Sequence, residues 1–219
     1  MELDPNTLDA SQRYRLMISG IVPRPIAFVS TINQEGVANL APFSFFTGIG
    51  ASPMRLLFCP ANQSDGTEKD TLRNAKPVSE GGTGQFVVNV ATEAYAREVA
   101  AAAEPLAYGE SEFDLTGLSM AASQVVKPPR LAESPVAFEC ETSQVIRLGS
   151  NEPGGPIPGG SNIVMGRVVH IFVRDDLIDG KYHVDPAGLA AIGRMGGRGY
   201  CRTSDRFEMP RGRSALEAD

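Results

Sequence analysis

The chain has 219 residues, of which 42% are hydrophobic and 21% charged, a balance typical of a globular protein rather than a disordered one. Its formal net charge of −6 argues against a general binder of nucleic acid, because such proteins need a basic surface to meet phosphates. A local basic cluster can still hold one small phosphate, and the length suits one large domain or two small ones.

The first half of the chain predicts a short helix followed by strands. The helix is expected over about 7–19, and Pro23 and Pro25 keep the next stretch extended, since proline disfavours helix in the residue before it. Apolar and β-branched runs on either side of the polar turn 33–36 predict a β-hairpin. The strands are expected over 26–32, 37–40 and 54–59.

The second half continues the series of strands. A strand over 86–90 precedes a helix over about 93–101, for which Thr92 is the expected cap. Apolar and polar residues alternate from Val136 to Ser143, which predicts a half-buried antiparallel strand. A further strand is expected over 163–173, and a Gly- and Pro-rich loop over 149–160. The tail from about Arg202 on is expected to be loose or to lie on a partner.

These elements favour a mainly β fold. Strands recur with turn signals between them, the helices are short and peripheral, and neither a βαβ rhythm nor an internal repeat is present. We therefore expect a closed or partly closed antiparallel barrel. The whole of 1–219 is expected to form one domain, with a core over about 14–175 and a Gly-rich segment and arm over about 190–219.

Several site types are excluded by missing residues. The three cysteines are far apart in sequence, which indicates neither a disulfide framework nor a zinc site and fits a reducing cytosol. With two histidines and none of the common nucleotide, protease or hydrolase motifs, the chain predicts no metal site and no catalytic residue. No signal peptide and no run of roughly 18 apolar residues is present, so we expect a cytoplasmic protein that contacts neither nucleic acid nor membrane.

One local motif could bind an anion. Thr67, followed three residues later by Asp70, matches a helix-capping pattern. The N-terminus of the helix would then offer free N–H groups to a phosphate, with Lys69, Thr71 and Arg73 beside it. The alternative is a plain capped surface helix.

A second feature could bind a flat heterocycle. The hairpin brings Ser30 and Thr31 close to the irregular run 39–46, which supplies an amide, a hydroxyl and backbone donors along one side. The alternative is that the phenylalanines of this run fill the barrel core, and for at least one of them we expect that outcome.

These two features, with the strand Phe86-Val87-Val88-Asn89-Val90, carry a family resemblance. The strings Arg24-Pro25-Ile26-Ala27-Phe28-Val29-Ser30-Thr31, Gly36, Asn39 and Ala41-Pro42-Phe43-Ser44-Phe45-Phe46 resemble the flavin reductase-like family, and Lys69-Asp70-Thr71 follows in the same order. The resemblance runs from about Tyr14 to Val173. It implies an antiparallel, Greek-key-like FMN-binding split β-barrel, often a homodimer with the flavin near the subunit interface.

The resemblance also implies a set of cofactor-binding residues. Ser30 and Thr31 would lie close to the flavin, Lys69 and Thr71 would hold its phosphate with Arg24 as the reserve cation, and the run from Asn39 would line the ring. The complete expected set is Arg24, Pro25, Ser30, Thr31, Asn39, Leu40, Ala41, Pro42, Ser44, Phe45, Lys69, Asp70, Thr71, Arg198 and Tyr200. Arg198 and Tyr200 belong to the Gly-rich segment 193–200, for which the alternative is a turn packed on the dimer surface.

The sequence departs from the family at one position. Asn162 stands where many short-chain flavin reductases have a histidine that helps to receive the nicotinamide, and asparagine carries no charge near pH 7. His170 is expected to be a satisfied core or interface residue, and His183 a surface one.

The resulting expectation is an FMN-dependent oxidoreductase, with FMN preferred to FAD. It would use NADH or NADPH and supply reduced flavin or electrons to an acceptor or a partner oxygenase, as a homodimer. The alternatives are an FMN-binding carrier or redox sensor without NAD(P)H turnover, towards which Asn162 leans, and a barrel that has lost its flavin.

Overall fold

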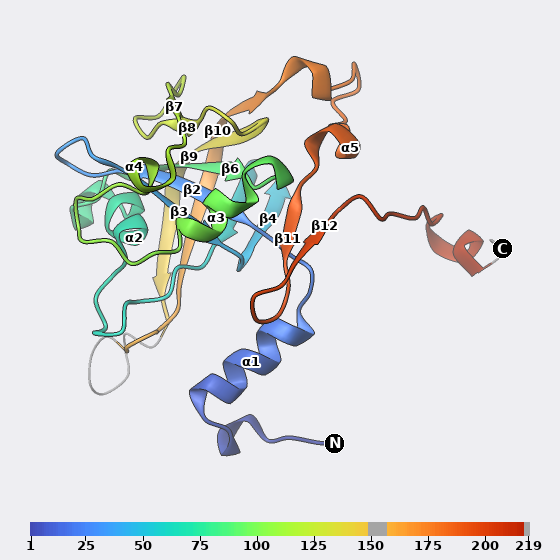
Figure 1. The fold of residues 1–219 in the computed structure, drawn as a ribbon, viewed down its shortest axis with the longest axis horizontal. Coiled ribbons are helices and arrows are strands. Elements are labelled where there is room, and N and C mark those ends of the chain that lie inside the picture. Colours follow the sequence, from blue (N-terminus) through green and yellow to red (C-terminus); the bar gives the residue numbers. More distant parts are fainter. Residues whose placement is uncertain (149–156, 217–219) are drawn as a thin grey trace.

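A seven-stranded antiparallel sheet forms the centre of the protein (Figure 1). The computed structural model describes residues 1–148 and 157–216. The strand order is β3-β2-β6-β9-β10-β5-β4, which leaves β3 and β4 as the two edges. The strands of this sheet are β2 (Ala27–Ile32), β3 (Ala38–Phe43), β4 (Phe46–Ala51), β5 (Met54–Phe58), β6 (Gln85–Val90), β9 (Val136–Arg147) and β10 (Asn162–Val173).

Two small sheets and short helices surround the central one. A three-stranded sheet has the order β1-β11-β12, and β7 pairs with β8. These strands are β1 (Arg24–Pro25), β7 (Met120–Ala121), β8 (Arg130–Leu131), β11 (Ile192–Arg194) and β12 (Tyr200–Arg202). The α-helices are α1 (Ala10–Gly20), α2 (Asp70–Ala75), α3 (Ala96–Ala101), α4 (Glu112–Thr116) and α5 (Pro186–Leu189). In the described ranges no helix is both long and apolar enough to cross a membrane.

The sheet packs two apolar clusters. One contains Phe58 and Phe86, whose ring centres are 5.2 Å apart, and draws side chains from β2, β3, β5, β6, β9, β10 and helix α2. The other joins β2 and β3 to α3 and α4, with Phe28 stacked near Tyr95. Strand β2 contributes to both clusters, so its consecutive side chains are buried on both faces of the sheet.

The free edge of β3 is covered by the start of α4. The N–H of Leu40 points away from β2 and donates to the Glu112 carboxylate at 2.8 Å, and the Ser111 hydroxyl donates to the carbonyl of Ala38 at 2.6 Å. Two residues further along β3, Pro42 has its backbone nitrogen on the same side of the strand as that of Leu40, and this nitrogen carries no hydrogen. These contacts occupy two outward backbone groups of β3, and Pro42 lacks a third, so the edge is less open to other strands.

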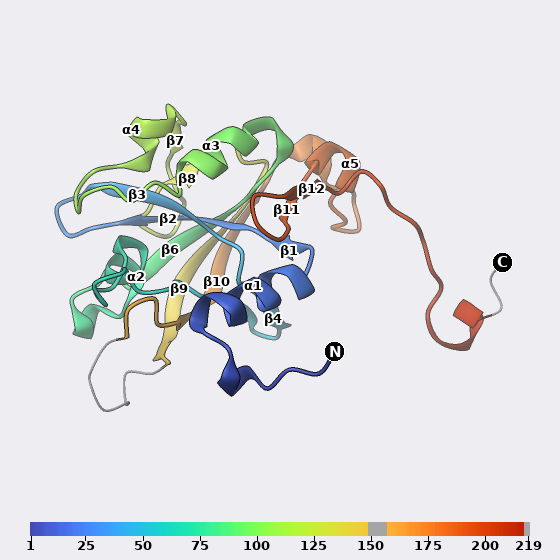
Figure 2. The same ribbon diagram turned by 60° about the horizontal axis from the view of Figure 1, so that its bottom comes forward.

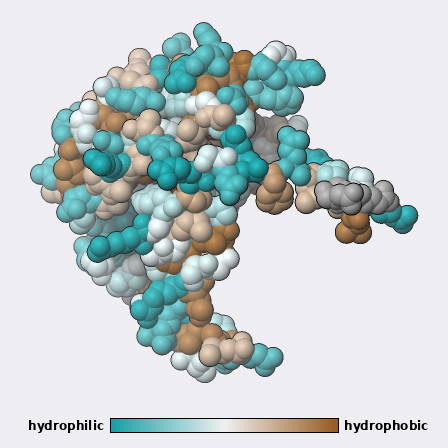
Figure 3. Space-filling model, turned by 45° about the vertical axis from the view of Figure 1, so that its right-hand side comes forward, coloured by the Kyte–Doolittle hydropathy of each residue, from teal (hydrophilic) through white to brown (hydrophobic). Residues whose placement is uncertain are grey.

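Helix α1 extends away from the sheet in the view of Figure 1, and the C-terminal arm leads away from it in Figure 2. Asp9 and Gln12 form a capping box that starts α1, yet none of the helix residues is buried. Apolar side chains are therefore exposed on both extensions (Figure 3). They are Tyr14, Leu16 and Met17 in α1, Ile21 and Val22 after it, and Phe207, Met209 and Leu216 in the arm.

A buried carboxylate fixes the loop between β7 and β8. Glu139 is 1% exposed and accepts the backbone N–H groups of Gln124, Val125 and Val126 at 2.7–3.1 Å. Burial opposes its ionisation, but these three donors and the nearby His170 outweigh burial and hold the pKa of Glu139 below its usual value. The charge on Glu139 is thus part of what holds this loop on β9.

The mainly β, antiparallel fold predicted from the sequence is confirmed, with three local corrections. Thr92 precedes a 3₁₀ turn, Glu93–Tyr95, without a capping bond from its side chain, so the expected cap is wrong. Strand β9 runs on to Arg147 because β10 pairs with it along its whole length. Strand β4 was not predicted, since its residues are mostly exposed and two are glycines. Most of the expected loop 149–160 lies outside the described residues.

Candidate functional site

Two adjoining pockets lie along β3 and share Pro42 and Ala103 in their walls. We call the first the α2 pocket, because the N-terminus of α2 lines it. Its walls are β3 from Asn39 to Phe43 except Leu40, the run Lys69–Thr71, the segment 102–106, Gln63 and Glu112. The sequence motifs around Asn39 and Lys69, separated by 30 residues in the chain, therefore meet in one cavity.

Helix α2 begins later than the sequence predicted. Asp70 is its first residue and Lys69 the residue before it, and no side chain caps this end. The expected capping pair of Thr67 and Asp70 is wrong, because Lys69 and not Thr67 is the residue that precedes the helix, and the Thr67 hydroxyl donates to the Asp65 carboxylate at 2.7 Å. The Lys69 side chain is exposed and, within the described residues, its ammonium has no ion-pair partner.

Thr71 presents a hydroxyl in this pocket. Its side chain is buried, and its oxygen accepts a hydrogen bond from the Asn39 amide at 2.9 Å. No other described residue accepts the Thr71 hydroxyl proton, so that proton is available to a ligand. A hydroxyl donor and an ammonium thus face the same cavity.

Acidic groups in the α2 pocket oppose this positive charge. One oxygen of Asp70 is buried without a hydrogen-bond partner, and the Arg73 guanidinium is 3.6 Å from it. Burial raises the pKa of Asp70, although Arg73 partly offsets that rise. Burial also raises the pKa of Glu112, in spite of the bond from Leu40 that favours its charged form. Both carboxyl groups are therefore easier to neutralise than exposed ones.

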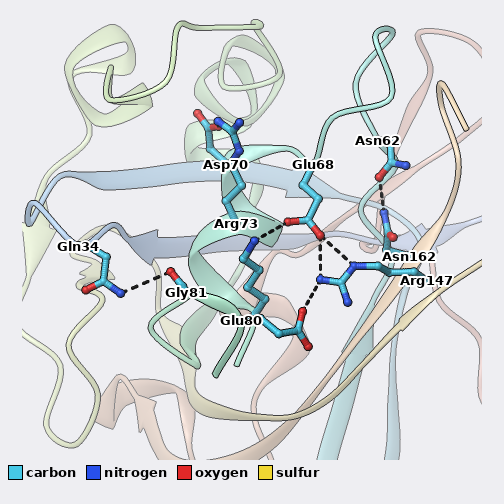
Figure 4. Close-up of polar contacts among 10 residues, drawn as sticks. Gln34, Asn62, Glu68, Asp70, Arg73, Glu80, Gly81, Arg147 and Asn162 are labelled. Atoms are coloured by element: carbon cyan, nitrogen blue, oxygen red, sulfur yellow. Dashed lines mark hydrogen bonds and ion pairs between the residues drawn. The ribbon is translucent and has the colours of Figure 1, made fainter. Parts of the chain in front are cut away.

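An ion-pair network holds the segment before α2 in place (Figure 4). Glu68 bonds to Lys76 at 2.9 Å and to Arg147 on β9 at 2.9 Å, and Arg147 continues to Glu80. Burial opposes the ionisation of Glu68, but the two cations outweigh burial and hold its pKa below the usual value. The network connects both ends of α2 to the sheet. It therefore fixes the position of Lys69, which precedes the helix.

We call the second cavity the arginine pocket. It lies between α1, β3, α3 and the β11–β12 hairpin, and its polar walls are Arg194, Arg198, Tyr200, Tyr14 and Ser44. The Arg194 guanidinium donates to the carbonyl of Gly199 and lies 4.6 Å from the centre of the Tyr200 ring. Arg198 and Tyr200 thus sit at the opposite end of the paired pockets from Lys69.

Arg24 does not line the arginine pocket but bonds to Ser44, which does. It is 4% exposed, and its guanidinium donates to the Ser44 hydroxyl and to the carbonyls of Ile18, Ile21 and Met195. It thereby connects the end of α1 to the β11–β12 hairpin. Since all these acceptors belong to the protein, the structure assigns Arg24 a supporting position rather than that of a free cation.

Five more of the expected site residues lie outside both pockets. The Ser30 hydroxyl donates to the carbonyl of Pro129, and the Thr31 hydroxyl accepts from Asn74, so both are buried within the protein. Leu40 is buried in the apolar cluster beside α3 and α4. The side chain of Phe45 packs beside Arg24, 5.9 Å from its guanidinium. Pro25 is exposed on β1 and also lines neither pocket.

Asn162 occupies a buried position rather than a wall of the two pockets. It is 2% exposed, and its amide donates to the carbonyl of Pro60 and to the side chain of Asn62 (Figure 4). It therefore fastens the start of β10. His170 lies on β10 with Nδ1 3.2 Å from the Glu139 carboxylate, and His183 is exposed beside Asp179, as expected for a surface residue.

Sequence reasoning missed many of the residues that line the pockets, and three of them carry polar or charged side chains from other elements. Tyr14, Glu112 and Arg194 approach β3 from distant parts of the chain. Only the family-like segment 193–200 gave a signal for one of them. Of the three phenylalanines near β3, Phe43 is a core residue, as was expected for at least one. No cluster of metal-binding side chains is found in the described ranges, and the three cysteines there are free.

Comparisons with known proteins match most of the chain. The family model described as "Flavin reductase like domain" matches residues 19–188. The structure of nitrilotriacetate monooxygenase component B from Bacillus cereus is 32% identical, covers 95% of this chain and 98% of its own, and has a TM-score of 0.86. The 2-nitrobenzoate 2-nitroreductase of Pseudomonas fluorescens is 29% identical, with coverage of 97% for both chains and a TM-score of 0.82. A Shewanella frigidimarina structure with a split barrel domain, 18% identical over 97% of this chain and all of its own, shares the fold with a TM-score of 0.78.

Proposed function

This chain belongs to the flavin reductase-like family, and from that premise we propose that it is an FMN-dependent oxidoreductase whose flavin occupies the two pockets along β3. We propose NADH or NADPH as the electron donor. The observation that carries the proposal is the meeting of the Asn39–Ser44 and Lys69–Thr71 motifs in adjoining cavities that share Pro42. An elongated ligand with a charged end and a flat end fits such a pair of cavities.

The residues of the α2 pocket suit the phosphate end of FMN. A phosphate monoester carries about −1.5 to −2 charges near pH 7 and needs at least one cation nearby. Among the described residues that line this pocket, Lys69 is the single cation, and the Thr71 hydroxyl proton adds a neutral donor. The carboxyl groups of Asp70, Glu104 and Glu112 also line this pocket, so the phosphate would have to lie on its Lys69 and Thr71 side.

The strand β3 suits the flat end. Asn39, Ala41 and Pro42 run along the α2 pocket, and Ser44 continues into the arginine pocket. Apolar edges and backbone groups of this kind hold a heterocycle without any charged contact. We propose that Arg198 and Tyr200 face the ring from the hairpin side.

The remaining expected residues would support the residues that line the pockets without contacting the flavin. In this proposal Ser30 and Thr31 fasten β2 to the Pro129 carbonyl and to Asn74 of α2, and Leu40 fastens β3 to Glu112 of α4. Arg24 orients the Ser44 hydroxyl, with Pro25 and Phe45 beside it. None of these six side chains would need to touch the flavin.

The chain's own contribution is binding and orientation. When bound, FMN would supply the redox chemistry, taking a hydride from the nicotinamide and releasing electrons to an acceptor. The protein groups would hold the phosphate in the α2 pocket and fix the ring along β3 and into the arginine pocket. No general acid or base is required for this role, which agrees with the absence of an expected catalytic residue.

The acceptor is the second part of the proposal. One structural relative is named as component B of a monooxygenase, which supports a partner oxygenase for this chain. The other is named as a nitroreductase, which makes a small nitroaromatic acceptor the alternative. We propose that the protein works in the cytoplasm as one domain.

We also propose a homodimer. Helix α1 buries none of its residues within one chain, and Tyr14, Leu16 and Met17 expose apolar surface on it. Surface of this kind on an extension is typical of a subunit contact. Light scattering coupled to size-exclusion chromatography tests the proposal, and a mass of one chain would refute it.

The first test is an absorbance spectrum of the purified protein, followed by anaerobic addition of NADH and then NADPH. Flavin bands that bleach with one nucleotide support the reductase and identify its donor. Bands that persist with both support a flavin carrier or redox sensor instead. A colourless protein that takes up no added FMN overturns the proposal.

The phosphate assignment has its own variant. Lys69→Ala removes the cation of the α2 pocket and should weaken FMN binding about tenfold, as expected for the loss of one charge-assisted contact. Lys181→Ala is the matched control, because Lys181 is exposed on a distant turn and lines neither pocket. Equal FMN affinity in the two variants would place the phosphate elsewhere.

A further inference from the structure

The C-terminal arm, residues 203–216, has almost no support within its own chain. Among the described residues its one hydrogen bond to the body joins the Thr203 hydroxyl to the carbonyl of Ala191. Phe207, Met209 and Leu216 are 85%, 58% and 89% exposed, and the arm leads away from the sheet (Figures 1 and 2). Apolar side chains on such a segment become covered only when another surface meets them.

Helix α1 offers an unsupported surface of its own. None of its residues is buried, and Leu16 is 48% exposed. A groove runs along one face of the helix, where residues three or four positions apart lie side by side. The groove is lined by Leu8, Gln12, Arg15, Leu16 and Ser19.

The arm and the region of α1 carry opposite charges. The residues up to the start of α1 include three carboxylates, whereas the arm from Arg206 to Arg213 has three arginines against one carboxylate. The charged residues are Glu2, Asp4 and Asp9 before the helix, and Arg206, Glu208, Arg211 and Arg213 in the arm. Arg15 in the groove adds a positive charge opposite in sign to Glu208. Charges arranged in this way favour contact between the two segments.

The arm has the length and backbone shape to lie along a helix. Fully extended, residues 203–216 span at most roughly 45–50 Å. Helix α1, with 11 residues, is about 16 Å long. Pro210 keeps the residue before it extended, and an extended backbone presents Phe207 and Met209 on the same side because they are two positions apart. Both apolar side chains can therefore face one groove.

We infer that the arm of one copy lies in the α1 groove of a second copy, with Phe207 and Met209 against Leu16, and that two copies exchange arms reciprocally. The inference rests on the proposed homodimer and assigns part of its contact surface. Within one chain no hydrogen bond or ion pair of the described residues joins the arm to 1–20. A reciprocal exchange about a two-fold axis covers both apolar surfaces in both copies at once.

The first test is a cross-link between two kinds of chain produced together in one cell. One chain carries Leu16→Cys, and the other carries Met209→Cys and a tag that changes its mass. Mild oxidation should join one chain of each kind, in at least fivefold higher yield than with Met120→Cys in place of Met209→Cys. Met120 is the matched control because it is 55% exposed on β7. Equal yields from the two pairs would overturn the inference.

A single chain with both Leu16→Cys and Met209→Cys separates exchange from folding back. A link between two chains supports the exchange. A link within one chain would mean that the arm covers its own helix, and it would overturn the inference.

The second test is the dissociation constant of the dimer, measured by sedimentation equilibrium. Phe207→Ser combined with Met209→Ser should raise this constant at least tenfold, because both apolar contacts are lost. Met120→Ser combined with Val125→Ser is the matched control and should leave it within threefold, since both residues are exposed apolar ones outside the arm and α1. Circular dichroism spectra that match the wild type confirm that both variants fold.

The outcomes separate this inference from the homodimer proposal. A wild-type mass of one chain refutes both. A wild-type dimer whose arm variant dissociates no more readily than the control leaves the homodimer standing and makes the arm assignment wrong. None of these readouts depends on flavin, so failure of the proposed FMN chemistry would be recognised separately.

Discussion

Arg24→Lys is expected to release helix α1 from the body of the protein. The guanidinium bridges two carbonyls near the C-terminus of α1, the carbonyl of Met195 and the Ser44 hydroxyl. A lysine ammonium has three donors on one atom and lacks the planar fork, so it cannot reach all of these separated acceptors. We expect it to keep about two of the four contacts.

The expected cost follows from those lost contacts. A hydrogen bond to a charged group contributes about 1.5–3 kcal/mol, so two losses amount to about 3–6 kcal/mol. The acceptors are only partly buried and can be hydrated, which reduces the net cost to about 2 kcal/mol. Because α1 has no buried residue, this free energy should appear as local opening of α1 rather than as global unfolding.

Hydrogen exchange measured by mass spectrometry tests this expectation. A change of about 2 kcal/mol corresponds to about 30-fold faster exchange of the α1 amides in Arg24→Lys, with β2 and β6 unchanged. Arg15→Lys is the matched control, since Arg15 is exposed on the same helix and its side chain makes no bond to the described residues. Exchange in α1 at the wild-type rate, or equal acceleration in α1 and β2, would refute the reasoning.

Three further variants test other contacts. A methyl group at Gly166 would lie 2.4 Å from the buried Phe86 ring, so Gly166→Ala should lower stability by about 1–3 kcal/mol in a urea titration, and an unchanged midpoint would contradict that packing. Glu139→Gln should cost about 2 kcal/mol at pH 7 through lost charge-assisted bonds to the β7–β8 loop. Because the folded pKa of Glu139 is lowered, its contribution is complete above the unfolded value near 4.5 and is lost as pH falls through the folded value. Melting temperatures of wild type and variant should therefore converge below about pH 4.5, and a constant difference down to pH 3 would argue against the charge. Asp70→Asn removes a negative charge from the α2 pocket and should tighten FMN binding about threefold to tenfold, whereas weaker binding would argue against phosphate there.

The sequence predicted the parts of the fold that depend on neighbouring residues. The hairpin of β2 and β3 follows from apolar runs on either side of a polar turn, and β6, β9 and β10 follow from similar runs. Strand β4 carries no such signal, because pairing with β5 rather than burial of its own side chains holds it in place. The Thr67 capping pattern failed because α2 begins at Asp70, three residues after Thr67, while both the N–H and the hydroxyl of Thr67 donate to Asp65 in a local turn.

The candidate site could be predicted only in part. Lys69 and Thr71 do meet Asn39, but only the family resemblance predicted this meeting. The resemblance also placed Ser30 and Thr31 at the ligand, and the structure buries both because β2 is an inner strand covered on each face. Contacts across the fold, such as that of Glu112 with Leu40 on β3, have no local signature in a single sequence.

The covered edge of β3 has a consequence for how the protein behaves outside its folded state. A strand that offers backbone groups to a ligand would also offer them to a strand of another molecule, which is how edge strands start aggregates. Ser111, Glu112 and Pro42 remove this hazard with one hydroxyl, one carboxylate and one missing N–H, while leaving the neighbouring residues of β3 open to a small molecule. Helix α4 therefore helps to keep the protein soluble. Variants that disrupt α4 are expected to precipitate during folding.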